Sequence, residues 1–196
     1  GAAVTEIAET PESVQTNLTQ DFSGALKGLL EGESILKEMK ELNLTAMYVN
    51  DTLLIAKRAF IGLYESGLAP ESSLDERNAK FIESLREMYY NTPKNEARKQ
   101  NFSEVVMLVE QIREHHAEAL SYHEKSSGLR SLIEKYELTP AVEFSEAAEA
   151  AKFERYRDAG SFLKAAEVSI VEEVSVKQRI SGLEDLTSGF IKRMLF

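Results

Sequence analysis

The sequence predicts an all-α protein: a single domain in which roughly six to nine helices pack as an antiparallel bundle. Apolar residues recur at steps of three and four along most of the 196-residue chain, which is the spacing of one helix face. No segment that could form a strand has an evident partner strand. The composition is 43% hydrophobic and 29% charged, which is typical of a globular domain with its own core.

The segment from Phe102 to His123 is the predicted centre of this fold. Its apolar side chains would lie on one face of a helix, with most of its charged residues elsewhere. Such a helix needs an apolar cover, so we expect the helices over 44–66, 74–90 and 161–181 to pack around it. The stripe consists of Phe102, Val105, Val106, Val109, Ile112, His116, Ala119, Leu120 and His123.

The N-terminal residues differ from the rest in having few apolar side chains. We therefore expect residues 1–13 to form a mobile arm before a helical domain over residues 14–196. Helical periodicity starts near Val14, and Gly32 is predicted to end this first helix.

The next two helical stretches are predicted over residues 35–42 and 44–66, with a break between them at Asn43. The pattern fits three short helices or one bent helix formed by all three stretches. Gly67 suits the left-handed conformation that commonly follows a helix. Pro70 cannot continue a helix, because it lacks the backbone N–H and its ring clashes with the preceding turn. Gly67 to Pro70 is therefore the clearest predicted turn.

Helix signals continue beyond this turn. Ser73 and Glu76 have the spacing of a capping box for a helix over 74–90. Thr92-Pro93 predicts the start of the central helix, with threonine as the cap and proline in the first helical position. We expect the central helix to end near Ser126-Ser127-Gly128.

The last part of the chain is also predicted to be helical. A short helix is expected over 129–138, and Thr139-Pro140 restarts the pattern. Residues 168–176 alternate in a strand-like way, but they also fit a helical stripe. Because no partner strand is evident, we assign them to a helix.

Composition and charge exclude several classes of protein. The formal net charge is −10 and is spread along the chain, so nucleic-acid binding, which depends on lysine and arginine neutralising phosphates, is not expected. No apolar run approaches the roughly 20 residues of a membrane-spanning helix. The chain has no cysteine, which excludes disulfides, cysteine nucleophiles and thiolate metal sites.

The sequence offers no catalytic or metal-binding constellation. His115 and His116 would point about 100° apart on a helix, and His116 and His123 would lie roughly 10 Å apart along its axis. No glutamate precedes any of them by three residues, as a di-iron site requires. Phosphate loops and hydrolase motifs are missing as well. We therefore expect no enzyme, no cofactor and no metal, and we interpret the histidines as core or boundary residues.

Four N-x-Ser/Thr sequons stand out, since about one is expected by chance for seven asparagines. They have two interpretations. Most lie where a helix is predicted to start, so the asparagines would serve as helix caps; alternatively, the chain is secreted and the sequons are N-glycosylation sites. The candidate residues are Asn17, Asn43, Asn50 and Asn101.

The C-terminal residues combine large apolar side chains with Lys192 and Arg193. They would form either a contact with a membrane surface or a partner, or a final turn packed on the core. The candidate contact residues are Phe190, Ile191, Met194, Leu195 and Phe196.

Two local stretches resemble the variable merozoite surface antigens of Babesia and its relatives. One is Lys37-Glu38-Met39 leading to Met47-Tyr48-Val49-Asn50-Asp51, and the other is Asn101-Phe102-Ser103 leading to Ile112-Arg113-Glu114-His115-His116. By composition, the chain is also similar to the glutamate/alanine-rich surface proteins of trypanosomes. The first resemblance implies a coat protein with a glycolipid anchor outside this sequence, located at the cell surface and taking part in erythrocyte attachment.

Two functional hypotheses follow, and a third class, a carrier of a lipid or small ligand in the bundle core, would need an internal cavity. The first is a non-enzymatic parasite surface antigen that contacts a host cell-surface protein or lipid, or that shields the parasite from immune recognition. The second is a cytoplasmic helical adaptor or effector that binds a partner helix in a groove.

Overall fold

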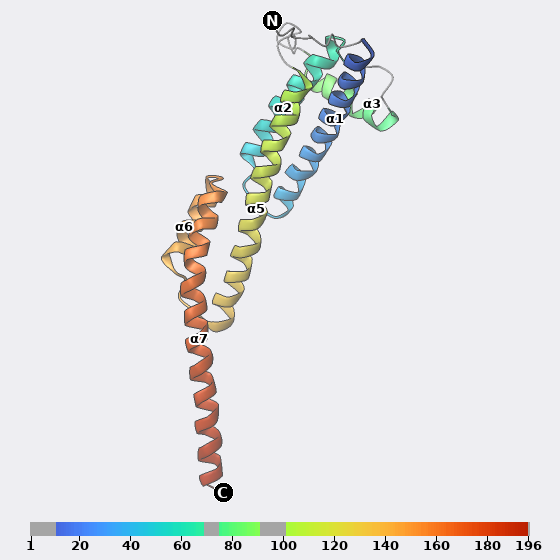
Figure 1. Cartoon of the computed structure of the whole chain (residues 1–196). Helices are drawn as coiled ribbons and strands as arrows, with labels where there is room; N and C mark the ends of the chain where they lie inside the picture. The colour runs from blue at the N-terminus through green and yellow to red at the C-terminus, as the bar shows by residue number, and fades with distance from the viewer. Residues whose placement is uncertain (1–10, 69–74, 91–100, 196) are drawn as a thin grey trace, which may run out of the picture. The chain divides into compact units, whose positions relative to one another are not determined.

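The computed structural model describes residues 11–68, 75–90 and 101–195, with side chains described from residue 17 onward. These ranges are entirely helical apart from short turns, which confirms the predicted all-α class (Figure 1). Six helices are described, the lower end of the predicted number. They are α1 (Pro11–Glu41), α2 (Met47–Glu65), α3 (Glu76–Met88), α5 (Phe102–Tyr136), α6 (Val142–Lys152) and α7 (Tyr156–Met194).

The packing of these helices divides the chain into two compact units. Unit 1 comprises residues 1–38 and 46–114, and unit 2 comprises residues 39–45 and 115–196. Helices α1 and α5 contribute residues to both units. The sequence predicted one helical domain over residues 14–196, and that description stays a prediction.

Unit 1 is built around three aromatic rings from three helices. The ring of Phe102 in α5 lies 5.6 Å from Phe22 in α1 and 5.8 Å from Phe60 in α2. Phe22 and Phe60 stack with their centroids 5.5 Å apart. The predicted packing of the central helix against residues 44–66 is therefore confirmed at Phe60. Helix α1 is a second cover that the sequence did not indicate.

Glycines in α1 allow the close approach of these helices. A Cβ atom on Gly28 would lie 3.1 Å from Val109 Cγ1, and one on Gly32 would lie 2.7 Å from Leu53 Cδ1. The prediction that Gly32 ends a helix is wrong, because α1 continues to Glu41. Gly32 is instead a packing residue, since any larger side chain would meet α2.

Unit 2 packs α6 against the first half of α7. The buried residues of α6 are small, namely Ala147, Ala150 and Ala151, which lets the two helix axes come close. Tyr156, at the start of α7, is buried and donates a hydrogen bond from its hydroxyl to the carbonyl oxygen of Thr45 at 2.6 Å. The buried face of α7 consists of Tyr156, Ala159, Leu163, Ala166 and Ile170.

Four helices end in the same way, with a residue in the left-handed conformation. These residues are Asn43, Gly67, Glu137 and Glu154, with φ between 48° and 78°. After each one, a backbone N–H reaches back five residues, as in Leu138 N to Ile133 O at 2.9 Å, which is the Schellman pattern. The predicted break at Asn43 and the turn at Gly67 are confirmed. The helix end near Glu137 agrees with the predicted helix over 129–138, but the left-handed conformation of Glu137 and the break at Glu154 were not predicted, because glutamate rarely adopts this conformation.

Two further predictions about helix ends are wrong. Helix α5 does not end at Ser126–Gly128 but continues to Tyr136. Leu129 and Ile133, in this last part of the helix, are buried. Helix α3 was predicted to have the Ser73/Glu76 capping box, but its cap is Asp75. The carboxylate of Asp75 accepts a hydrogen bond from Asn78 N at 2.7 Å.

Some sequence-based expectations fall on residues that are not described. Ser73 and Thr92-Pro93 lie outside the described ranges, and so do residues 1–10 of the expected N-terminal arm. The backbone of residues 11–13 belongs to α1.

Candidate functional site

The most exposed apolar surface among the described residues lies on the C-terminal half of α7. Every residue from 176 to 195 except Gly189 is exposed, and we call this segment the exposed half of α7. Its last contacts with α5 are a hydrogen bond from Gln178 Nε2 to Tyr136 Oη at 2.9 Å and a longer one from Lys177 Nζ to Glu137 O at 3.4 Å. Beyond Gln178, no described side chain of α7 hydrogen-bonds or forms an ion pair with another described element.

The predicted C-terminal contact residues lie on this segment. Phe190, Met194 and Leu195 are 62%, 72% and 74% exposed, and Ile191 is also exposed. The alternative interpretation, a final turn packed on the core, is therefore wrong for these four residues. Phe196 lies outside the described residues.

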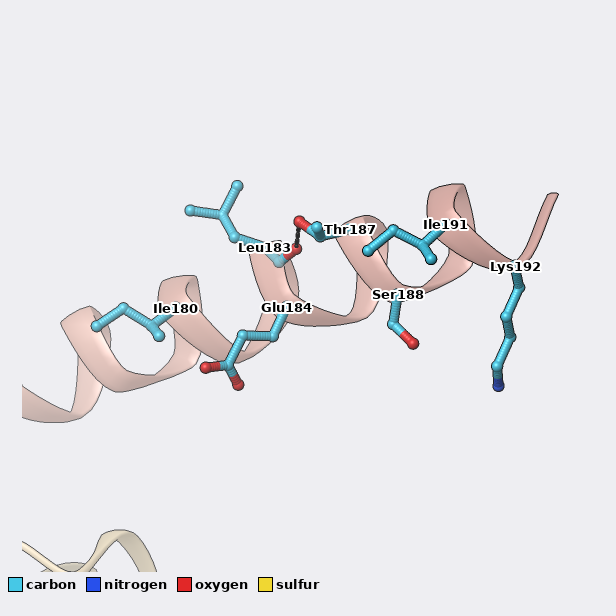
Figure 2. Close-up of a pocket in the computed structure, with 7 residues that line it drawn as sticks. All are labelled: Ile180, Leu183, Glu184, Thr187, Ser188, Ile191 and Lys192. Atoms are coloured by element: carbon cyan, nitrogen blue, oxygen red, sulfur yellow. Dashed lines mark hydrogen bonds between the residues drawn. The ribbon is translucent and has the colours of Figure 1, made fainter. Parts of the chain in front are cut away.

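The exposed half of α7 carries a shallow apolar groove along one side (Figure 2). All of its lining residues come from this one helix, so the groove has no second wall. Thr187 turns its hydroxyl back to the carbonyl oxygen of Leu183 at 2.8 Å, which satisfies that hydroxyl within the helix. The groove is lined by Ile180, Leu183, Glu184, Thr187, Ser188, Ile191 and Lys192.

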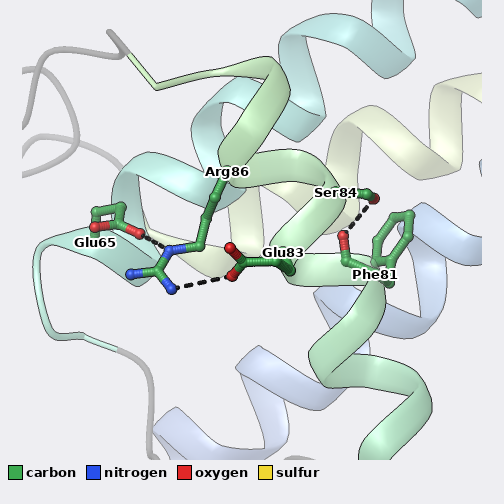
Figure 3. Close-up of polar contacts among 5 residues, drawn as sticks. All are labelled: Glu65, Phe81, Glu83, Ser84 and Arg86. Carbon is green, nitrogen blue, oxygen red and sulfur yellow. Dashed lines mark hydrogen bonds and ion pairs between the residues drawn. The ribbon is translucent and has the colours of Figure 1, made fainter.

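A second surface feature, in unit 1, holds α3 against α2 (Figure 3). Arg86 on α3 donates from Nε to Glu65 at 2.5 Å and from Nη1 to Glu83 at 3.3 Å. Its guanidinium also lies 5.7 Å from the ring centre of Tyr64. The hydrogen bond with Glu65 is the main cause that raises the pKa of Arg86. The contact with Glu65 joins α3 to α2, so the feature is a clamp between two helices.

Unit 2 contains His115, which the sequence predicted to be a core or boundary residue and whose side chain is 13% exposed. The Nε2 atom of His115 lies 3.8 Å from a carboxylate oxygen of Glu154, and its ring meets Tyr156 edge-on at 5.2 Å. Burial lowers the pKa of His115, while Glu154 and Glu118 oppose that shift. Burial also raises the pKa of Tyr156 to about 12. The pairing of His115 with Glu154 was not predictable, because Glu154 is distant in the chain and lies in an unexpected turn.

Among the described residues, no three histidine, aspartate or glutamate side chains gather where they could hold a metal ion. The four sequon asparagines are not brought together. Asn101 caps α5 by accepting a hydrogen bond from Glu104 N at 3.1 Å, whereas Asn43 occupies a left-handed helix end. Asn17 lies within α1 and Asn50 in the first turn of α2. The capping interpretation is therefore confirmed only for Asn101, and glycosylation stays a prediction.

Among the described helices, none combines the length and apolarity that crossing a bilayer requires. Comparison of the chain with protein-family profiles, with curated proteins and with solved structures found no match.

Proposed function

We propose that this protein is a non-enzymatic binding protein whose contact element is the exposed half of α7. The observation that carries the proposal is the apolar character of a helix with no cover. Leu183, Leu186 and Phe190 are each more than 60% exposed. Clustered apolar surface of this kind generally marks an interaction site. A helix in water gains most of its stability by burying such a face.

The cellular setting that we propose is the parasite surface. The resemblance to merozoite surface antigens implies a coat protein that serves erythrocyte attachment or immune shielding. The spread of negative charge, −10 over the chain, supports contact through an apolar element rather than through a basic patch.

Binding of the purified protein to intact erythrocytes tests the attachment role. We expect saturable binding that Phe190→Ser together with Leu195→Ser reduces about tenfold or more, since both side chains would be buried in the contact. Met107→Ser is the matched control, because Met107 is 61% exposed on α5 and lies outside the contact element. Absence of saturable binding would contradict attachment, and equal loss in the control would contradict the assignment to α7.

A second candidate is a cytoplasmic adaptor that inserts the same helix face into a partner's groove. The spacing of Ile180, Leu183 and Thr187 along one side of α7 fits the anchor positions of helix-in-groove recognition. Antibody staining of intact and permeabilised cells separates the two candidates. Staining of intact cells supports the surface antigen, and staining only after permeabilisation supports the adaptor.

A further inference from the structure

The exposed half of α7 carries the residue spacing of a coiled coil. From Val176 onward, one set of residues recurs at alternating steps of four and three, which places them at the a and d positions of a heptad. Five of the six are apolar, and Thr187 is the exception. We call this set the α7 seam: Val176, Ile180, Leu183, Thr187, Phe190 and Met194.

The α7 seam is not a continuation of the buried face of α7, which contacts α5 through Tyr156. That face ends at Ile170, and steps of three and four from it lead to polar residues such as Lys177, Glu184 and Ser188. At about 100° per residue, Ile180 lies about 80° and Leu183 about 140° around the helix from Ile170. A second helix could therefore pack on the seam without displacing the residues that cover the buried face of α7.

The residues beside the seam match a parallel pairing of two identical helices. In that arrangement, a g residue lies near the e residue five positions later on the other helix. The three resulting pairs are Glu172 with Lys177, Arg179 with Glu184, and Leu186 with Ile191. Two pairs have opposite charges and the third is apolar; of the charged pairs, Arg179 with Glu184 lies wholly within the exposed half of α7.

An antiparallel pairing is disfavoured by the same charges. Overlapping the whole seam in that direction would place Glu184 opposite its own copy. It would also bring Arg179 opposite Arg193, because antiparallel helices pair e with e and g with g. Like charges in direct opposition destabilise such an interface.

We propose that the exposed half of α7 pairs with that of a second copy of this chain, in parallel and in register, as a short two-stranded coiled coil. The inference rests on the proposed function, because it takes the same helix as the contact element and names its partner. The glycines at 182 and 189 lower helix propensity, and Thr187 interrupts the apolar seam. The association is therefore weak and depends on protein concentration.

Sedimentation velocity over a range of concentrations, combined with charge reversal, tests the pairing. The mass should rise toward twice the 22.0 kDa of one chain. Arg179→Glu and Glu184→Arg should each weaken self-association about tenfold, because each creates two like-charge contacts per dimer. The double variant should restore it, and a mixture of the two single variants should form the heterodimer. Neither residue has a charged residue three or four positions away, so the pairs within the helix are unchanged.

Disulfide trapping tests the orientation, and the absence of cysteine makes a single introduced thiol specific. Thr187→Cys should form a linked dimer under mild oxidation, since a residue at an a position faces its own copy in a parallel pair. Ser188→Cys, one residue away and off the seam, is the matched control and should link much more slowly. Equal linking of the two variants would overturn the parallel register.

The outcomes separate this inference from the proposed function. A monomer at every concentration, or a dimer that ignores both charge reversals, overturns the pairing; erythrocyte binding that Phe190→Ser with Leu195→Ser weakens would then leave the proposed function standing. A dimer that follows the charge pattern, together with no binding to intact erythrocytes, supports the pairing and removes the attachment role.

Discussion

At the scale of single residues, close packing in unit 1 depends on glycines in α1, which have no side chain to hold the helices apart. Gly28 faces Val109, and a Cβ at Gly28 would lie 3.1 to 3.3 Å from three valine carbons. Valine is stiff about its first side-chain torsion, so it cannot turn away easily. The glycine lowers helix propensity, yet it permits α1 and α5 to touch.

Substitution of Gly28 should therefore have the opposite effect to substitution of a neighbouring glycine. We expect Gly28→Ala to lower the free energy of unfolding by about 1–3 kcal/mol through overpacking. Gly24→Ala should raise it by about 1 kcal/mol through helix propensity, since a Cβ there would meet only Val106 at 4.0 Å. Urea unfolding of both variants measures the difference, and stabilisation by both would refute the packing role of Gly28.

A second residue-scale effect concerns Glu137, which has φ of 48° at the end of α5. The left-handed region costs an ordinary L-residue roughly 1–2 kcal/mol, and glycine avoids that cost. We expect Glu137→Gly to be more stable than Glu137→Ala by about 1 kcal/mol, because alanine keeps the strained geometry. Thermal unfolding compares the two, and the reverse order would contradict the assigned backbone conformation.

The residue-scale findings also show what the sequence could predict. Gly67 and Asn43 are residue types that favour a left-handed helix end, so their positions were predictable. The left-handed conformations of Glu137 and Glu154 were not predictable, because tertiary packing imposes this conformation on a residue type that does not favour it. Gly32 was misassigned for the converse reason: its role depends on Leu53, which only the folded structure brings near.

At the scale of elements, the contact between α5 and the turn after α6 leads us to expect that the stability of unit 2 depends on pH. Burial lowers the pKa of His115 below its ordinary value of 6.5, so the folded state favours the neutral ring. The unfolded state then takes up the proton first as the pH falls. The contribution of His115 to stability is therefore fully present above pH 6.5 and is lost as the pH falls toward its lower folded pKa.

Replacement of His115 by glutamine should remove the pH-dependent contribution of this residue to the free energy of unfolding. We expect the free energy of unfolding of His115→Gln to fall less than that of the unmodified protein between about pH 7.5 and pH 5. The measurement is a urea titration at each pH, compared as the difference between the two proteins. A constant difference across this range would show that protonation of His115 is not linked to folding.

The elements themselves were largely predictable, but the joins between them were not. The apolar periodicity of α5 and α2 identified both helices and their shared core, because that pattern is local. Helix α1 covers the same core through Phe22, Leu26 and Leu29; its periodicity predicts a helix, but only the folded structure shows that it packs on α5. The C-terminal contact residues were candidates from their composition, but their exposure follows from the length of α7, whose periodicity changes face after Ile170.

At the scale of the whole molecule, the net charge of −10 governs the approach to any negatively charged surface. Erythrocyte surfaces are negatively charged, so long-range repulsion opposes attachment and weakens as salt screens it. We expect binding to cells or to anionic vesicles to hold steady or strengthen as the salt concentration rises. Binding that weakens steeply with salt and ignores Phe190→Ser would exclude an apolar contact through α7.

The exposed half of α7 has one further consequence, for its own folding. A lone helix of this length is marginal in water, and Gly182 and Gly189 loosen it further. Its backbone amides should therefore exchange hydrogen for deuterium much faster than those around Ile112 or Leu163, which are buried in the two units. When a second helix covers the α7 seam, the same amides become protected, so the partner completes the folding of the segment that it binds.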